Sequence, residues 1–520
     1  MNRRAAPARG PILILLTVMV VAGLLVGRFA SDGTPGADAA HPLDVMVPAA
    51  SALSTSWYCA GGTSAPGGAA DETIVLGNVG TGDATATITV TSGDTNTDPT
   101  TVRTSRTRDV TIAAHSSMRE QVSSILAAAE VGVMVESRGG QLVVEQEVTG
   151  SGDVSLGPCA REASNRWAFA SGSTEKGARD WIAIYNPFND GAKVDITSYS
   201  LDYSETPNAP QLKRDVISSI AVDPRHETVV ELSSPDALGR RDQVGVVVHA
   251  SEGTVVATRR LQFEQFSFPP APAAGQPAAP VYRGLALGLG APGPSGTWVF
   301  PEGPVGTGLR ETIDILNPGA TKATAQVDFQ PVGVARPVTL TVELPPHQVT
   351  RVDPTSSVQG VPAGSAAGTA AAALPHTTVV QHRSGPAIFV EQMLSGNSAP
   401  TVGITATFGL TRASTRWAFV PGRLDAASLD GLRIFNPSGR AVTMHLEAYQ
   451  SGSLVPLGPA SRTRLAADGV WKPSLDGLGV PADAVLVVVA DAPVYGARAD
   501  VNPGFTVGNG VPFPGPSEPQ

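Results

Sequence analysis

The chain repeats one short pattern four times, and this repetition limits the folds it can adopt. The pattern reads SWYCAGG, RWAFASG, TWVFPEG and RWAFVPG, and it contains Trp57, Trp167, Trp298 and Trp417. These tryptophans are 110, 131 and 119 residues apart. A propeller blade or solenoid repeat has only about 20 to 50 residues, so each copy is long enough to be a small domain.

An asparagine follows each tryptophan at nearly constant spacing. Asn78, Asn186, Asn317 and Asn436 come 21, 19, 19 and 19 residues after their tryptophans, within LGNVG, IYNPF, ILNPG and IFNPS. An Asn side chain can bond nearby backbone in a turn, and proline cannot continue a strand ladder. We therefore predict that a strand ends at each asparagine.

Apolar residues alternate with other residues on both sides of these turns. In the third copy, Ile313 and Ile315 precede Asn317, and Ala325 and Val327 follow it. A period of two predicts a β-hairpin with one buried face. Further strand patterns give six or seven strands per copy, which suits a two-sheet immunoglobulin-like sandwich of about 100 residues. The 56 glycines and 44 prolines are consistent with many turns.

The sequence thus predicts an all-β chain of four tandem immunoglobulin-like β-sandwich domains after an N-terminal transmembrane or signal-anchor helix. The predicted sandwiches span residues 52–160, 161–267, 297–411 and 412–505. The remaining segments are a basic cytoplasmic segment at 1–10, the anchor at 11–30, a linker at 31–51, a Pro/Ala/Gly-rich linker at 268–296 and a tail at 506–520.

The predicted anchor contains an apolar run over residues 12–27, and Arg3, Arg4 and Arg9 precede it. This run is long for a cleavable signal peptide and slightly short for a membrane span. We expect an uncleaved anchor, and secretion after cleavage is the alternative. The basic residues would keep the N-terminus inside, which predicts a single-pass protein of the cell membrane with its bulk extracellular.

Cys59 and Cys159 are the two cysteines of the chain. Cys59 stands where the other copies have Phe169, Phe300 and Phe419, and Cys159 comes just before the second copy. Outside the cytoplasm we expect a disulfide between them. The alternative is two separate buried thiols that act as small hydrophobes.

The sequence predicts no catalytic residues, no metal site and no cofactor. The histidines have no metal-ligand spacing, and only His376 and His382 are close together. Residues 94–98 resemble the start of a calcium loop, but Pro99 stands where such a loop needs glycine. A net charge of −10 makes nucleic acid an improbable partner.

Charged residues near the end of each copy differ in sign between copies. The first and third copies have Glu145, Glu147 and Glu391, whereas the second and fourth have Arg259, Arg260 and Arg498. A catalytic dyad would need one fixed pair of residues. We therefore interpret these positions as solvated strand edges.

The W-[YA]-F-x-x-G and N-P motifs resemble a module that occurs in tandem in surface and secreted proteins of actinobacteria and their relatives. The first copy, with Trp57-Tyr58-Cys59 and with Ala69-Ala70-Asp71 leading into Leu76-Gly77-Asn78, together with the N-terminal segment, is similar to the actinobacterial family named domain of unknown function 5719. The resemblance covers residues 52 to about 505 and departs at Cys59 and at Val79, which replaces proline. It implies a fold and no reaction.

These observations predict a non-enzymatic, membrane-anchored protein of the cell envelope, held in the membrane by residues 11–30. Its repeats would serve structural or protein-interaction roles, with an unidentified envelope protein or a cell-wall glycan as partner. One alternative is a glycan-binding module in cell-wall or exopolysaccharide assembly, for which Trp181 and Trp471 are the candidate exposed aromatics. Trp181 flanks a predicted buried strand, however, and we expect it to cover the edge of that strand. The other is an unrecognised extracellular hydrolase. The sequence does not identify binding residues.

Overall fold

The protein was analysed as a computed structural model. The structure describes residues 45–96, 103–139, 141–205, 209–269, 278–303, 308–332, 337–354, 375–399, 401–421, 431–501 and 505–513. Its elements are β-strands and three short 3₁₀ helices, at Val122–Ser124, Pro459–Ser461 and Asp476–Leu478, which confirms the all-β prediction. The predicted anchor at 11–30 lies outside these residues. Among the described residues, no helix has both the length and the apolar character that crossing a bilayer requires.

The first two repeats contain strands β1 to β17. The first has β1 (Ser54–Gly62), β2 (Asp71–Asn78), β3 (Ala84–Ser92), β4 (Asp94–Thr95), β5 (Ser105–Ile112), β6 (Ser116–Gln121), β7 (Val131–Arg138), β8 (Leu142–Gly150) and β9 (Asp153–Pro158). The second has β10 (Arg166–Phe169), β11 (Ala178–Asn186), β12 (Ala192–Asp202), β13 (Gln211–Val222), β14 (His226–Glu231), β15 (Asp242–Glu252), β16 (Val256–Phe266) and β17 (Tyr282–Leu289).

The third and fourth repeats contain strands β18 to β34. The third has β18 (Thr297–Gly303), β19 (Leu309–Asn317), β20 (Ala323–Pro331), β21 (Val338–Leu344), β22 (Gln348–Val352), β23 (His376–Ser384), β24 (Phe389–Ser398) and β25 (Thr401–Phe408). The fourth has β26 (Ser414–Phe419), β27 (Gly431–Phe435), β28 (Val442–Gln450), β29 (Ser453–Leu454), β30 (Arg462–Leu465), β31 (Val470–Trp471), β32 (Val485–Val501), β33 (Phe505–Asn509) and β34 (Val511–Pro512).

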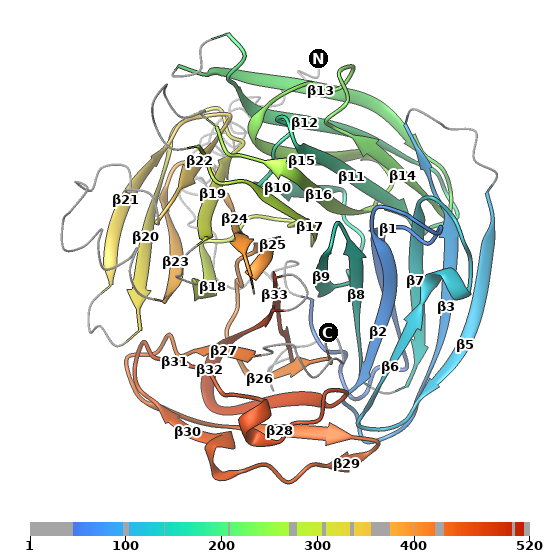
Figure 1. Cartoon of the computed structure of the whole chain (residues 1–520). Helices are drawn as coiled ribbons and strands as arrows, with labels where there is room; N and C mark the ends of the chain where they lie inside the picture. The colour runs from blue at the N-terminus through green and yellow to red at the C-terminus, as the bar shows by residue number, and fades with distance from the viewer. Residues whose placement is uncertain are drawn as a thin grey trace, which may run out of the picture. The chain divides into compact units, whose positions relative to one another are not determined.

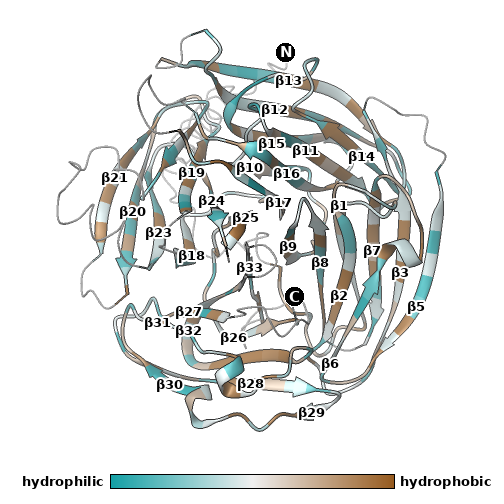
Figure 2. Ribbon diagram, in the orientation of Figure 1, coloured by the Kyte–Doolittle hydropathy of each residue, from teal (hydrophilic) through white to brown (hydrophobic). Residues whose placement is uncertain are grey.

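Each repeat has two layers of strands. The outer layer contains the tryptophan strand, in the orders β1-β7-β3-β5, β10-β15-β12-β13 and β18-β23-β20-β21. The inner layer contains the asparagine strand, in the orders β6-β2-β8-β9, β4-β14-β11-β16-β17 and β22-β19-β24-β25. In the fourth repeat the long strand β32 pairs with β26 and β28 in one half and with β27 and β33 in the other. Figure 2 shows polar and apolar residues alternating along many strands, as the period-two pattern predicts.

The four tryptophans are buried in the hydrophobic cores between the layers. In the first repeat Trp57 packs with Ile74 and Leu76 of the inner layer and with Ile88 and Val133 of the outer layer. The structure joins Cys59 and Cys159 by a disulfide whose Cα atoms are 4.7 Å apart, and both cysteines belong to this core. The bond therefore ties the first strand of the repeat to the residue after its last strand.

Each repeat asparagine is buried and makes the same set of hydrogen bonds. The Asn317 amide nitrogen donates to the carbonyl of Thr321 at 2.9 Å, of Leu344 at 3.0 Å and of Pro345 at 3.1 Å. Its side-chain oxygen accepts the N–H of Gly319 at 3.0 Å. Asn78, Asn186 and Asn436 repeat this arrangement. The asparagine thus fixes two turns at once, and the first of them carries the chain from the inner to the outer layer. The predicted β-hairpin is therefore wrong, because the strands before and after the asparagine, such as β19 and β20, belong to different layers and do not pair with each other.

Two segments that the sequence assigns to a linker and a tail contain strands. Strand β17 lies in the predicted linker at 268–296 and pairs with β16 along nearly its whole length. The predicted tail at 506–520 contains most of β33 and all of β34. Both predictions are therefore wrong for these residues. Strand β17 reads YRGLALGL, and its small residues leave few of the bulky side chains from which strands are recognised.

The last strands of the four inner layers contact one another. Within the compact unit Leu43–Gln520, β9 contacts β17 and β33, and β25 contacts the same two strands. Figure 1 shows β9, β17, β25 and β33 side by side. The repeats therefore pack together through their inner layers rather than being separated by flexible linkers.

Candidate functional site

The charged residues near the end of each copy, on β8, β16, β24 and β32, are buried. Glu145, Glu147, Glu391, Arg259, Arg260 and Arg498 are each at most 5% exposed. The prediction of solvated strand edges is therefore wrong. Each of these strands lies between two others, as β16 does between β11 and β17, so its residues are not at an edge. We take the buried polar contacts between repeats as the candidate functional site.

An acidic residue stands six positions before each repeat asparagine in the sequence. These residues are Glu72, Asp180, Glu311 and Asp430, of which Asp430 lies outside the described residues. Arg259 donates from Nε to Asp180 Oδ1 at 2.9 Å, and Gln392 donates from Nε2 to Glu311 Oε1 at 2.6 Å. This constant spacing is visible in the sequence, and it could have identified the buried acids.

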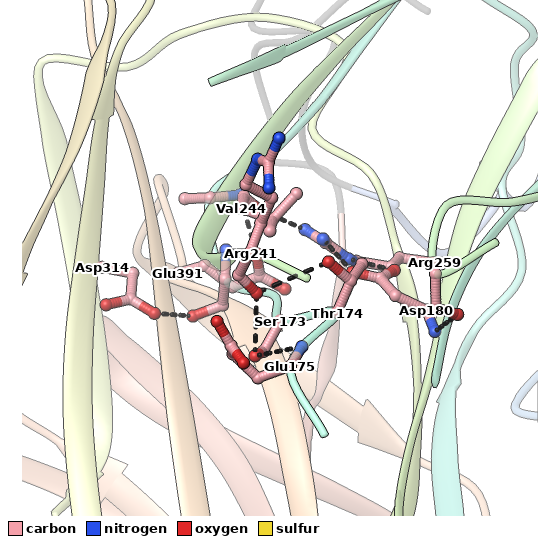
Figure 3. A network of polar contacts seen from close by, with 12 residues as sticks. Ser173, Thr174, Glu175, Asp180, Arg241, Val244, Arg259, Asp314 and Glu391 are labelled. Carbon is pink, nitrogen blue, oxygen red and sulfur yellow. Dashed lines mark hydrogen bonds and ion pairs between the residues drawn. The ribbon is translucent and has the colours of Figure 1, made fainter. Parts of the chain in front are cut away.

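The polar network between the second and third repeats is shown in Figure 3. Glu391 on β24 accepts the backbone N–H of Ala170 at 2.9 Å and of Ser171 at 2.8 Å through Oε2. The Ser171 hydroxyl donates to Asp314 on β19. Two acidic residues of the third repeat therefore bind the loop that follows the tryptophan strand of the second repeat.

Two arginines complete this network. Arg259 pairs with Asp180 and donates to the carbonyl of Val244 at 2.8 Å. Arg351 on β22 of the third repeat donates to Asp314 Oδ1 at 2.8 Å and to Asp242 Oδ2 of the second repeat at 2.9 Å. Each arginine thus neutralises at least one buried carboxylate, which is how proteins accommodate charge away from water.

A similar junction joins the first and second repeats. Arg260 donates to both carboxylate oxygens of Glu130 at 2.9 Å and to the carbonyl of Gly61 at 3.0 Å. Glu227 accepts the N–H of Gly61 at 3.0 Å. The Arg260 guanidinium lies 4.7 Å from the ring centre of Trp181, which is buried. Trp181 is therefore not the exposed aromatic that the glycan-binding alternative would need, as expected for a residue that flanks a buried strand, and Trp471 is half-buried.

Burial shifts the protonation of several junction carboxylates. Desolvation raises the pKa of Glu72 to about 8 and the pKa of Glu145 to about 8. It also raises the pKa of Glu391 to about 7, opposed by Arg259 and by the two backbone N–H groups. At neutral pH the Glu72 carboxyl is therefore protonated in the folded protein.

We expect the free energy of unfolding to fall as pH rises. The pKa of Glu72 is raised from 4.5 to about 8, so its contribution is complete below about pH 4.5 and is lost as pH approaches 8. Glu72→Gln imitates the protonated acid and should lessen this fall, which amounts to at most about 1.4 kcal/mol per pH unit for one group. Urea unfolding at about pH 5, 6.5 and 8 measures how the free energy of unfolding changes with pH. The exposed Glu136→Gln is the control, and identical slopes for E72Q and the parent chain would contradict the prediction.

The last inner strands meet at a second set of contacts, made largely by backbone. Asp153 on β9 accepts the N–H of Leu285 on β17 at 2.9 Å and of Ile404 on β25 at 2.8 Å through Oδ2. A Cβ atom on Gly288 would lie 3.1 Å from the carbonyl of Ala406, so a side chain there would crowd the neighbouring strand. A small cavity of about 90 Å³ lies here, lined by all four repeats.

These contacts form an interface between repeats. Ser171 and Asp314 are fully buried, and Glu391 Oε2 and Asp153 Oδ2 accept backbone N–H groups. His376 pairs with Glu311 at 2.8 Å. In the part of the chain that the structure describes, no three His, Cys, Asp or Glu residues are placed to share a metal ion.

One model of a known protein family matches part of the chain. The model of a family of unknown function, DUF5719, matches residues 141–386. This match confirms the resemblance to that family for the end of the first repeat, the second repeat and most of the third. Among solved structures, the crystal structure of Thermotoga maritima 1070 is 17% identical over 22% of this chain and 94% of that one, with a TM-score of 0.18. A comparison with curated proteins gives no match.

Proposed function

We propose that this protein is a non-enzymatic, membrane-anchored component of the cell envelope. Its four immunoglobulin-like repeats would form one rigid body that holds binding surfaces in fixed positions outside the membrane. The observation that supports this most directly is which groups the buried charged side chains bind. Asp180, Arg259, Glu391 and Asp153 bind neighbouring strands and repeats instead of facing a cleft.

The physical argument is one of rigidity. Tandem domains joined by linkers move relative to one another unless their interface is large or specific. Here the junctions of the second repeat with the first and with the third bury charged groups whose partners come from the adjacent repeat, such as Arg351 with Asp242 and Arg260 with Glu130. Separating two repeats would leave these charges unpaired, which is costly. The repeats should therefore act as one unit that presents its outer layers and loops to partners.

The extracellular location rests on two features. The Cys59–Cys159 disulfide is typical of proteins that fold in an oxidising compartment. The apolar run at 12–27 follows basic residues, a pattern that favours insertion with the C-terminal bulk outside.

A fusion of the full chain to alkaline phosphatase tests the proposal, because this enzyme becomes active only after export. We expect active phosphatase that stays with the membrane fraction after an alkaline wash, and cysteines that react with maleimide only after reduction. Leu16→Arg with Val20→Arg should abolish export, because two charges in the apolar run oppose insertion. Inactive phosphatase in the parent fusion, or freely reactive thiols, would overturn the proposal.

A further inference from the structure

The outer layer of the first repeat has a polar face. Strand pairing places Ser56, Glu136, Thr87 and Asp109 in one row across β1, β7, β3 and β5. The next row contains Ser54, Arg138, Thr85 and Thr111. These side chains share the face opposite the tryptophan core, because residues alternate between faces along a strand.

This face is hollowed. The two rows line a concavity of about 580 Å³, within the range of ligand-binding pockets. Four neighbouring strands are about 4.8 Å apart, so each row extends about 14 Å, the scale of a short oligosaccharide.

The equivalent position in the other repeats is occupied by residues that bond within their own repeat. Thr87 stands nine residues after Asn78, and the corresponding residues are Asp195, Gln326 and His445. Asp195 accepts the N–H of Ser219 at 2.7 Å, Gln326 donates to Asp328 at 2.7 Å, and His445 lies 3.2 Å from Glu447. In the first repeat Thr87 likewise bonds within its own repeat, donating to Asp109 Oδ1 at 2.7 Å, while Glu136 in the same row and Arg138 in the next row are exposed.

These groups match the chemistry of sugar hydroxyls. The carboxylates of Asp109 and Glu136 accept hydrogen bonds, Arg138 donates them, and the serine and threonine hydroxyls can do both. Two carboxylates against one guanidinium disfavour an anionic ligand. A neutral, hydroxyl-rich chain can donate hydrogen bonds to both carboxylates and accept them from the guanidinium.

We propose that the outer face of the first repeat, over β1, β7, β3 and β5, binds a neutral glycan, with Asp109, Glu136 and Arg138 as its main polar contacts. This inference deepens the proposed function by naming a ligand class for one displayed surface. It requires no particular cellular location, so its test is independent of the export experiment.

Affinity electrophoresis of the full chain in mild detergent tests this proposal, with gels containing dextran, mannan or a soluble β-glucan, and with polygalacturonate as an anionic comparison. We expect retardation by at least one neutral polysaccharide. The double variant Asp109→Ala/Glu136→Ala should weaken it at least about ten-fold, which corresponds to the loss of about 1.4 kcal/mol. Gln326→Ala on the third repeat is the matched control and should leave retardation unchanged.

Because Asp109 and Glu136 are exposed, their replacement should hardly affect folding, which circular dichroism of the variant verifies. No retardation by any neutral polysaccharide would overturn the proposal. Equal retardation of the parent chain and the double variant would also overturn it, as would preferential retardation by polygalacturonate.

Discussion

Replacing Arg259 with methionine is expected to lower the free energy of unfolding by about 3 to 5 kcal/mol, because it leaves the Asp180 carboxylate buried without a cationic partner. Arg259 and Asp180 are 3% and 0% exposed, so water cannot solvate the remaining charge. Methionine fills much of the arginine volume, which limits the contribution of an empty cavity. Urea unfolding followed by the fluorescence of the buried tryptophans measures the change.

The neighbouring ion pair between Arg179 and Glu231 offers a matched control. It lies on the same inner layer, but its side chains are 55% and 30% exposed. Arg179→Met should therefore cost at most about 1 kcal/mol. The double variant Asp180→Leu/Arg259→Met should recover much of the loss, because it removes both charges. A similar small cost for Arg179→Met and Arg259→Met would show that the buried pair does not stabilise the junction.

Asp153→Ala should open the contact among the last inner strands. The Asp153 carboxylate accepts three backbone N–H groups, those of Val154 at 2.8 Å, Leu285 at 2.9 Å and Ile404 at 2.8 Å. Each buried N–H left without a partner costs about 1 to 3 kcal/mol, so the free energy of unfolding should fall by several kcal/mol. Hydrogen exchange should accelerate at Leu285 and Ile404, which belong to the second and third repeats.

The exposed Asp109→Ala serves as the comparison and should leave exchange at these two amides unchanged. Asp153→Asn retains one acceptor oxygen and should have an intermediate effect. Unchanged protection of Ile404 in Asp153→Ala would mean that the first repeat does not hold the third through this residue.

Much of each repeat could be predicted from local sequence. The alternation around Asn317 identified β19 and β20 as strands, and the asparagine spacing located the same turn four times, but the two strands pair in different layers and form no hairpin. The strand β17 was missed because it reads YRGLALGL, in which small residues hide the pattern. Its glycines are needed where strands of different repeats approach closely, as Gly288 approaches the carbonyl of Ala406.

The candidate site was misread for a related reason. Glu391 and Arg259 were interpreted as solvated because charged residues are usually exposed, and a single strand does not reveal what covers it. The partners of Glu391 are the backbone N–H groups of Ala170 and Ser171, more than 200 positions away in the chain. The acidic residue six positions before each asparagine was a readable signal for this layer, but it does not identify the partner.

By itself, the sequence determined the repeated unit: where strands alternate, where the asparagines turn the chain, and which tryptophans enter the cores. These properties depend on residues within about twenty positions of one another, so the order of residues is enough to specify them. Only the tertiary structure decided that the inner layers pack together and that Asp180, Arg259, Glu391 and Asp153 are buried there. Whether a charge is solvated or paired depends on residues that are distant in sequence and close in the fold. The sequence of one strand does not show which residues pack against it.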